Sequence, residues 1–325
     1  MLDCPAFQTR FSQMTVHLAS STHSSQSVRS LFYLDHLTVL SVAGDDAGKF
    51  LQGQLTCNIN ELTDEKAGIA AFCNAKGRAI CTLLIVKTGP VYRLILPVAL
   101  VDKVRQKLQM YVLRSKVILN DGFDDFKLLG LVGDVDRSLG DHMPSSRFEV
   151  LPQPVTTLRL TSNQPKFLCV VESQSLELFV NRLNDQGFTR GDIDDWRYNE
   201  LSDGLPWLDL RTSEQFIPQM LNLDLLGGIS FNKGCYTGQE IIARTHYLGK
   251  TKRQLFVADC EAEIDTSTNP AVIDAITGEK VGEILASCVY QGKTRLQLIL
   301  QTVDGETKSL ILDGIECARL TLTSE

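Results

Sequence analysis

The sequence lacks the patterns that mark several large classes of protein. It contains neither the GxGxxG pattern of dinucleotide-binding folds nor a Walker phosphate loop, which argues against a dinucleotide or nucleoside triphosphate enzyme. Its longest apolar runs, such as 83–86 and 94–96, have the length of strands and cannot span a membrane as helices. No apolar core of a signal peptide stands near the N-terminus. We therefore expect a cytoplasmic protein with no membrane contact and a loose tail over residues 1–30.

The cysteines exclude two further classes. All nine are scattered, their number is odd, and no two form a CxxC pair, so their spacing predicts neither a metal site nor a disulfide framework. Most stand in apolar, strand-like runs, as Cys81 does in AICTLLIV and Cys169 in FLCVV. We expect most of them to be small buried side chains in a reducing compartment.

The charge balance is acidic. A net charge of −7 provides no overall attraction to nucleic acid, although 43% hydrophobic and 22% charged residues are typical of a soluble globular protein. Contact with phosphates would need a local basic patch, which composition cannot reveal. We therefore expect no strong direct binding of nucleic acid.

The order of elements predicts an α+β fold. A first domain is expected over 31–120, completed by 193–250, and a second α+β domain over 121–192. In the first, strands are expected at 38–43, 68–73, 78–86 and 92–96. A helix should follow, with an apolar stripe formed by Val101, Val104, Leu108 and Tyr111.

The C-terminal part has a different pattern. After residue 251 the helical periodicity ends, and six short strand-like segments follow, separated by turns that contain Gly and Asp. This predicts a small antiparallel barrel or sandwich over 251–325.

One segment contains a candidate reactive group. Residues 233–240 read KGCYTGQE, in which Thr237 and Glu240 have the spacing of a capping box, so a helix is expected to begin at Gly238. Cys235 would stand just before that helix and near Lys233. The helix partial charge and the lysine would both favour the thiolate form of the cysteine. An inert loop thiol is the alternative interpretation of the same features.

The same segment resembles a known family. The elements KGCYTGQE, QFIPQ at 215–219, GGISF at 227–231 and KR at 252–253 resemble the corresponding elements of the YgfZ family in the same order. Upstream, LQGQLT at 51–56 and CNAKG at 73–77 resemble that family's LQGQVT and CDAKG. The resemblance runs from about residue 35 to the C-terminal domain and is densest at 204–254. The residues of the octapeptide are Lys233, Gly234, Cys235, Tyr236, Thr237, Gly238, Gln239 and Glu240.

This resemblance implies both a fold and a function. The YgfZ family is related to the aminomethyltransferase, or T-protein, of glycine cleavage. It implies a three-domain cloverleaf, in which two α+β domains and a C-terminal antiparallel β-barrel surround a central folate channel. It also implies binding of tetrahydrofolate or a derivative, and support of iron–sulfur enzymes, including MiaB-like enzymes of tRNA modification. Cys235 would be the working group, with Lys233 beside it.

Some family positions that contact folate are changed in this sequence. One of two tryptophans falls on Trp196 and is kept, whereas the other falls on Leu37. The family's EAG-P stretch reads SDGLP at 202–206, so Ser202 stands where the family has Glu. Asp203 or Glu200 would then supply the carboxylate for the pterin.

Two more residues are assigned to the same folate site. Arg114 would meet the glutamate tail of folate, although a solvated helix end is the alternative. Gln215 opens the QFIPQ element. The catalytic Asp of T-proteins has no counterpart, because residues 77–83 read GRAICTL and contain no acid. We therefore expect no aminomethyl transfer.

Three functions from different classes remain open. The first is a folate-binding accessory protein for iron–sulfur enzymes that acts through Cys235. The second is a folate-dependent one-carbon transferase of the aminomethyl or methyl type, which the missing Asp disfavours. The third is a folate-independent scaffold, which Ser202 favours and the intact octapeptide disfavours.

Overall fold

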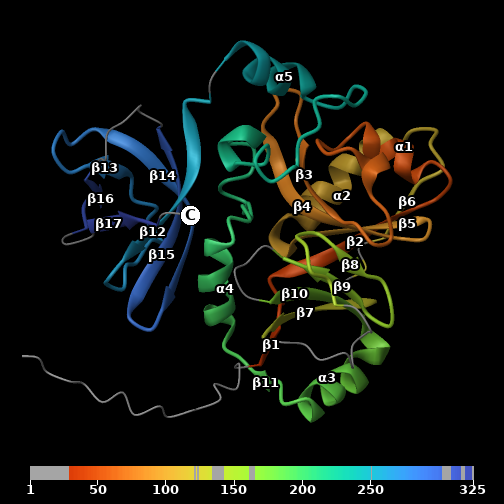
Figure 1. Cartoon of the computed structure of the whole chain (residues 1–325). Helices are drawn as coiled ribbons and strands as arrows, with labels where there is room; N and C mark the ends of the chain where they lie inside the picture. The colour runs from red at the N-terminus through yellow and green to blue at the C-terminus, as the bar shows by residue number, and fades with distance from the viewer. Residues whose placement is uncertain are drawn as a thin grey trace, which may run out of the picture.

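The chain folds into three sheets, as a computed structural model of all 325 residues shows (Figure 1). The structure describes residues 29–120, 122, 124–133, 143–160, 165–249, 251–301, 309–315 and 319–323. Most of the tail expected over residues 1–30, together with Cys4 and Cys317, lies outside the described residues. The predicted α+β architecture with a C-terminal antiparallel barrel is confirmed.

The first sheet has five antiparallel strands in the order β3-β4-β5-β2-β6. Their bounds are Leu37–Ala43 (β2), Gly68–Cys73 (β3), Ala79–Thr88 (β4), Val91–Pro97 (β5) and Ile118–Asn120 (β6). Helices α1 (Ala47–Gln52) and α2 (Val98–Val112) accompany it. The predicted stripe of α2 buries Val101, Val104 and Leu108, but Tyr111 is exposed, because the stripe turns away from the sheet at the end of the helix.

The second sheet has six strands in the order β11-β1-β7-β10-β9-β8. Their bounds are Ser30–Tyr33 (β1), Phe126–Val132 (β7), Val150–Leu151 (β8), Thr156–Arg159 (β9), Lys166–Glu172 (β10) and Thr189–Arg190 (β11), with helix α3 at Leu176–Asp185. The first domain was expected to begin at residue 31. The strand that begins there, β1, instead pairs with β7 and β11 and belongs to the second sheet. It is placed there by Leu31, which is buried in the core between this sheet and α3.

The third sheet closes into a barrel in the order β12-β15-β14-β13-β16-β17. Its strands are Arg253–Cys260 (β12), Val272–Asp274 (β13), Lys280–Tyr290 (β14), Lys293–Gln301 (β15), Leu310–Leu312 (β16) and Arg319–Leu322 (β17). The barrel has its own apolar core, which includes Val272, Leu296 and Leu298. Closure leaves no open edge between these strands.

The remaining helices connect the three sheets. Helix α4 (Ile193–Ser202) runs between the barrel and the two other sheets, and α5 (Gln239–Leu248) stands at the far end of the first sheet (Figure 1). Among the described residues, short 3-10 helices occur at Ile59–Glu61, Ser173–Ser175 and Pro218–Leu221. Within the described ranges, no helix is long and apolar enough to cross a membrane.

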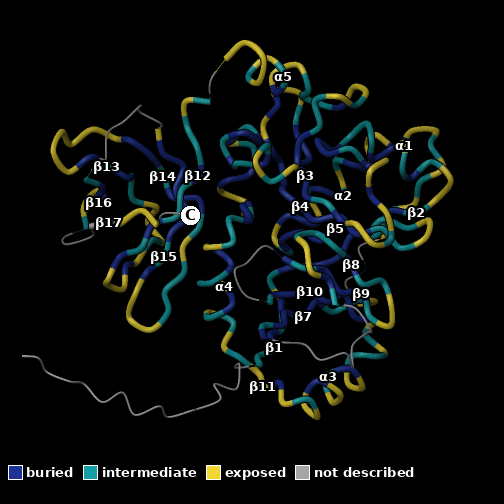
Figure 2. The backbone as a smooth tube through the Cα atoms, in the orientation of Figure 1, coloured by how far each residue is buried: buried dark blue, intermediate teal, exposed yellow. Residues whose placement is uncertain are grey.

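Besides the separate cores of the barrel and of α3, one larger core reaches all three sheets. The largest cluster of buried side chains includes Leu84 of the first sheet, Leu168 of the second, Trp196 of α4 and Leu285 of the barrel. Figure 2 shows buried backbone running through both α+β sheets and along the inner side of α4. Because the apolar surfaces are continuous, the sheets should hold a defined position relative to one another.

Candidate functional site

The octapeptide at 233–240 packs against the β3–β4 turn where two glycines meet, Gly238 of the octapeptide and Gly77 of the turn. Gly238 has φ +83°, and a Cβ placed on it would lie 2.5 Å from the carbonyl oxygen of Asn74 and 2.8 Å from the Cα of Gly77. A side chain on Gly77 would in turn press on Ile241 of α5. Glycine is needed at 238 both for its left-handed backbone and for this close approach.

The capping box expected at Thr237 does not form. Helix α5 begins at Gln239, one residue later than predicted, and Gly238 occupies the N-cap position without a side-chain cap. The backbone N–H of Thr237 donates to the carbonyl of Gly53 at 3.3 Å, and its hydroxyl lies 3.4 Å from Oε1 of Gln54. The contact with residues 53–54 holds Thr237 outside the helix, which explains the difference.

Lys233 ties the octapeptide to the segment after α1. Its Nζ donates to the carbonyl oxygens of Leu55 and Cys57, both at 2.7 Å, and lies 4.9 Å from the ring centroid of Tyr236. Burial lowers the pKa of Lys233 to about 8. The ammonium group was expected beside the sulfur of Cys235, but it makes its hydrogen bonds to these two carbonyls.

Cys235 differs from the other described cysteines in its exposure. Five are buried, Cys288 is half-buried, and Cys235 is exposed; the buried ones are Cys57, Cys73, Cys81, Cys169 and Cys260. Burial raises the pKa of Cys57 and of Cys169 to about 12, which keeps these thiols protonated at neutral pH. Among the described residues, no group of His, Cys, Asp and Glu could hold a metal ion.

The two glycines of the octapeptide allow a matched test of its packing. We expect Gly238→Ala to lower the free energy of unfolding by about 2 kcal/mol or more, because it combines a left-handed backbone with contacts to neighbouring backbone atoms. Gly234→Ala is the control, since a Cβ there meets no atom within 4 Å. Urea unfolding followed by circular dichroism measures both. Equal stability of the two variants would contradict the packing described for Gly238.

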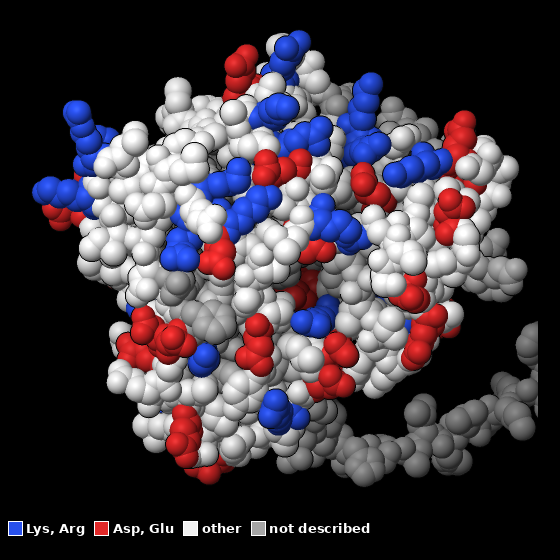
Figure 3. Space-filling view, turned by 180° about the vertical axis from the view of Figure 1, so that it is seen from behind, with Lys and Arg blue, Asp and Glu red and all other residues white. Residues whose placement is uncertain are grey.

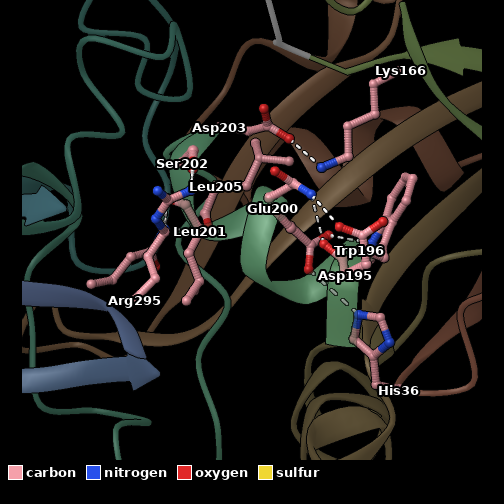
Figure 4. Close-up of polar contacts among 12 residues, drawn as sticks. His36, Lys166, Asp195, Trp196, Glu200, Leu201, Ser202, Asp203, Leu205 and Arg295 are labelled. Carbon is pink, nitrogen blue, oxygen red and sulfur yellow. Dashed lines mark hydrogen bonds and ion pairs between the residues drawn. The ribbon is translucent and has the colours of Figure 1, made fainter. Parts of the chain in front are cut away.

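A second polar region lies at residues 202–206, where all three sheets meet (Figure 4). The hydroxyl of Ser202 accepts a hydrogen bond from Arg295 of the barrel, whose guanidinium also binds both carboxylate oxygens of Asp259 at 2.7 and 2.8 Å. The carbonyl oxygen of Pro206 accepts from Thr82 of the first sheet. Asp203 binds the second sheet through Lys166. One short segment therefore links the three units.

The link to the second sheet is a buried ion pair. Nζ of Lys166 lies 2.6 Å from Oδ2 of Asp203, and only 1% and 7% of the two side chains is exposed. Burial raises the pKa of Asp203 to about 6, although the ammonium of Lys166 acts in the opposite direction. Burial also opposes the ionisation of Glu200, but a hydrogen bond and charge from His36, 3.5 Å away, and the charge of Lys166 outweigh it and lower its pKa.

Trp196 is part of the core at this junction. Its side chain is 1% exposed, its ring centroid lies 5.4 Å from that of Phe32, and Nζ of Lys166 lies 4.3 Å above it. A Cβ on Gly130 would lie 2.4 Å from the indole, so that glycine makes room for the ring. The indole nitrogen donates to Glu200 at 3.3 Å. The ring therefore has no free face on which a pterin could stack.

The residues that the sequence assigned to a folate site lie in separate parts of the structure. Trp196, Glu200, Ser202 and Asp203 come together at the junction, next to His36 and buried Leu37. Arg114 lies just beyond the C-terminal end of α2, a helix of 15 residues that is about 22 Å long. It lines a cavity of about 830 Å³ with Asp46, Lys49, Phe50, Gly53, Gln54, Tyr111, Leu113 and Ser115. Gln215 is exposed, and its carbonyl accepts a hydrogen bond from Arg78 in the β3–β4 turn.

Some residues of the junction were missed in the sequence. Nε2 of Gln297 donates to the carbonyls of Leu201 and Leu205 at 3.1 and 3.2 Å, although Gln297 stands in the strand-like run LQLIL. Lys166 precedes another apolar run, where a surface position would be the ordinary expectation. No local signal marks either residue, since their partners are distant in the chain.

Part of the junction fits a folate and part does not. Oε1 of Gln297 is a buried acceptor without a hydrogen-bond partner among the described residues, and a pterin has N–H groups that could donate to it. The carboxyl of Asp203 has the acceptor chemistry for the same polar edge, but it is paired with Lys166 at 2.6 Å and only 7% of its side chain is exposed. The covered ring of Trp196 does not fit the stacking role expected for it.

The arrangement of the sheets matches a known fold. The chain superposes on the glycine cleavage system aminomethyltransferase T from Bartonella henselae with a TM-score of 0.72 at 14% identity, over 91% of this chain and 84% of that one. A scan against protein-family models finds no match. The protein is thus a member of the structural class of T-protein-like folds.

Sequence comparison identifies the family within that class. The chain is 31% identical over 276 residues to the tRNA-modifying protein YgfZ of Colwellia psychrerythraea, covering 80% of this chain and 84% of the relative. It is 33% identical over 242 residues to the protein of the same name from Escherichia coli, covering 73% of each. The chain belongs to the YgfZ family.

Proposed function

We propose that this protein is a folate-binding accessory factor that supports tRNA modification by iron–sulfur enzymes through Cys235. Membership of a family whose relatives are named tRNA-modifying proteins supports the part that concerns tRNA. The T-protein-like fold supports the part that concerns folate. Asp203 and Gln297 would hold the polar edge of the pterin. When bound, the folate would supply a carrier for one-carbon units.

The exposure of Cys235 on a fixed loop is the observation that carries the proposal. Hydrogen bonds to backbone carbonyls hold the chain on either side of the cysteine. The side chain of Lys233 donates to the carbonyls of Leu55 and Cys57, and the backbone N–H of Thr237 donates to that of Gly53. The thiol itself faces solvent. A scaffold would have no use for a reactive group presented in this way, whereas a partner enzyme could reach it.

The start of β4 disfavours the transferase alternative. At Cys81 and Thr82 both side chains are buried, and the hydroxyl of Thr82 is used in the bond to Pro206. No carboxylate stands in residues 77–83 to handle a proton on a folate nitrogen. An accessory role is the better match to this chain.

Folate binding is tested by calorimetry. We expect tetrahydrofolate to bind with roughly micromolar affinity, near −8 kcal/mol. The variant Cys235→Ser is the control and should bind equally well, because among the described residues Cys235 is not a hydrogen-bond or ion-pair partner of Asp203 or Gln297. Absence of heat at millimolar tetrahydrofolate would contradict folate binding and favour the scaffold.

A further inference from the structure

Helix α5 and the β3–β4 turn form a surface with excess positive charge. Lys76 and Arg78 are exposed on the turn, and Arg244 is exposed one helical turn beyond Ile241, which packs on Gly77. Behind them on α2, Lys103 and Lys107 share a single carboxylate, that of Glu214, at 2.9 and 3.7 Å. Seen from behind, Lys and Arg gather across the upper half of the molecule, over α2 and towards α5 (Figure 3). This surface is basic although the net charge of the whole protein is −7.

Aromatic rings stand beside this charge. His246 of α5 stacks on Phe231 with centroids 3.7 Å apart, and Tyr247 meets the edges of both rings at 4.8 and 6.2 Å. Tyr247 is 63% exposed. The rings lie about 9 Å along the helix axis from Ile241, where the basic turn makes contact. Exposed rings next to cations are the elements with which proteins hold single-stranded nucleic acid.

The surface adjoins the working cysteine of the proposed function. Gly238 touches the β3–β4 turn, and Cys235 precedes it by three residues, so their Cα atoms are at most about 11 Å apart. A strand bound across the turn and the N-terminal end of α5 would therefore pass within about 11 Å of the backbone of Cys235.

We propose that α5 and the β3–β4 turn dock a single-stranded segment of RNA beside Cys235. Lys76, Arg78 and Arg244 bind its phosphates, and Tyr247 stacks on a base. The aromatic rings favour RNA over an acidic protein, because carboxylates would use the charge but not the exposed rings. This deepens the proposed function, on which it rests, by making the substrate tRNA itself a partner.

The test measures binding of a fluorescent single-stranded oligoribonucleotide of about 15 nucleotides by anisotropy. We expect roughly micromolar affinity at about 50 mM salt and weaker binding at about 200 mM. The double variant Lys76→Glu/Arg244→Glu should weaken binding by at least about tenfold and lower the salt slope by about 1.4, since each of the two lost phosphate contacts contributes about 0.7 on a single strand. Tyr247→Ala should weaken it by about tenfold without changing the slope. Lys280→Glu, an exposed position on the barrel, is the matched control and should have no effect.

Two results would overturn this inference. One is wild-type affinity in the double variant. The other is equal binding of inorganic polyphosphate and RNA together with no effect of Tyr247→Ala, which would mean a surface that recognises charge alone. Neither result depends on Cys235. A chain that binds RNA as expected but whose Cys235→Ser variant still supports modification would keep the RNA surface and lose the proposed role of the cysteine.

Discussion

Replacement of Lys166 with Met is expected to lower the free energy of unfolding by about 3 kcal/mol or more at neutral pH. The substitution removes the ammonium group 2.6 Å from Asp203 and leaves that carboxylate buried without its partner. It also removes a cation that lowers the pKa of Glu200 and that covers the ring of Trp196. Few single changes in the chain should cost as much, because one side chain serves three buried neighbours.

A second variant separates the charge from the packing. Lys166→Met/Asp203→Leu removes both charges, and buried ion pairs can often be replaced by apolar side chains at little cost. We expect its urea midpoint to recover most of the loss, when unfolding is followed by circular dichroism. A double variant as unstable as Lys166→Met alone would show that the charge on Asp203 is not the cause.

The penalty of Lys166→Met should also depend on pH. The pKa of Asp203 is raised from 3.8 to about 6, so this carboxyl contributes stability that is fully present below about pH 3.8 and is lost as the pH rises through about 6. Without Lys166 its pKa should rise further, because the cation that favours the ionised form is gone. The loss of stability relative to the wild type should therefore be constant below about pH 6 and grow as the pH rises above about 6, where Asp203 ionises in the wild type but stays protonated in the variant. A loss independent of pH would contradict this account.

Local patterns were sufficient to predict most elements of the fold. The strands β3 and β5, the helix α2 and the C-terminal barrel follow from apolar periodicity and turn residues within short windows. The position of β1 could not be predicted in this way, because Ser30–Tyr33 fits either sheet as a short apolar strand. Its partners, such as Leu131 opposite Leu31, lie far along the chain.

The residues of the candidate site were easier to predict than their contacts. The octapeptide could be identified from its sequence. The direction in which the side chain of Lys233 points could not, because it depends on the carbonyls of residues 55 and 57, which only folding brings near. Trp196 could be assigned to a folate site from the resemblance, but its covered ring could not be predicted, because the cover depends on Gly130 and Phe32. Gln297 carried no signal at all, because a lone Gln in a strand-like run gives no indication of which residues its side chain will contact.

Replacement of Cys235 with Ser should abolish the support of tRNA modification while leaving the fold intact. Cys235 is exposed, and its sulfur makes no hydrogen bond to the described residues that a hydroxyl would lose, so the urea midpoint should equal that of the wild type. The octapeptide should keep its place, because the contacts of Lys233 and Thr237 do not involve the sulfur. Loss of function with unchanged stability would distinguish a working thiol from a structural one.

The decisive measurement is the fraction of tRNA that carries the iron–sulfur-dependent modification in a bacterial strain lacking its own YgfZ. Nucleoside mass spectrometry would compare the wild-type chain with Cys235→Ser at equal protein levels. We expect restored modification with the wild type, and with the variant only the level of the strain that carries no YgfZ. Restoration by Cys235→Ser to the wild-type level would contradict the central role assigned to the cysteine.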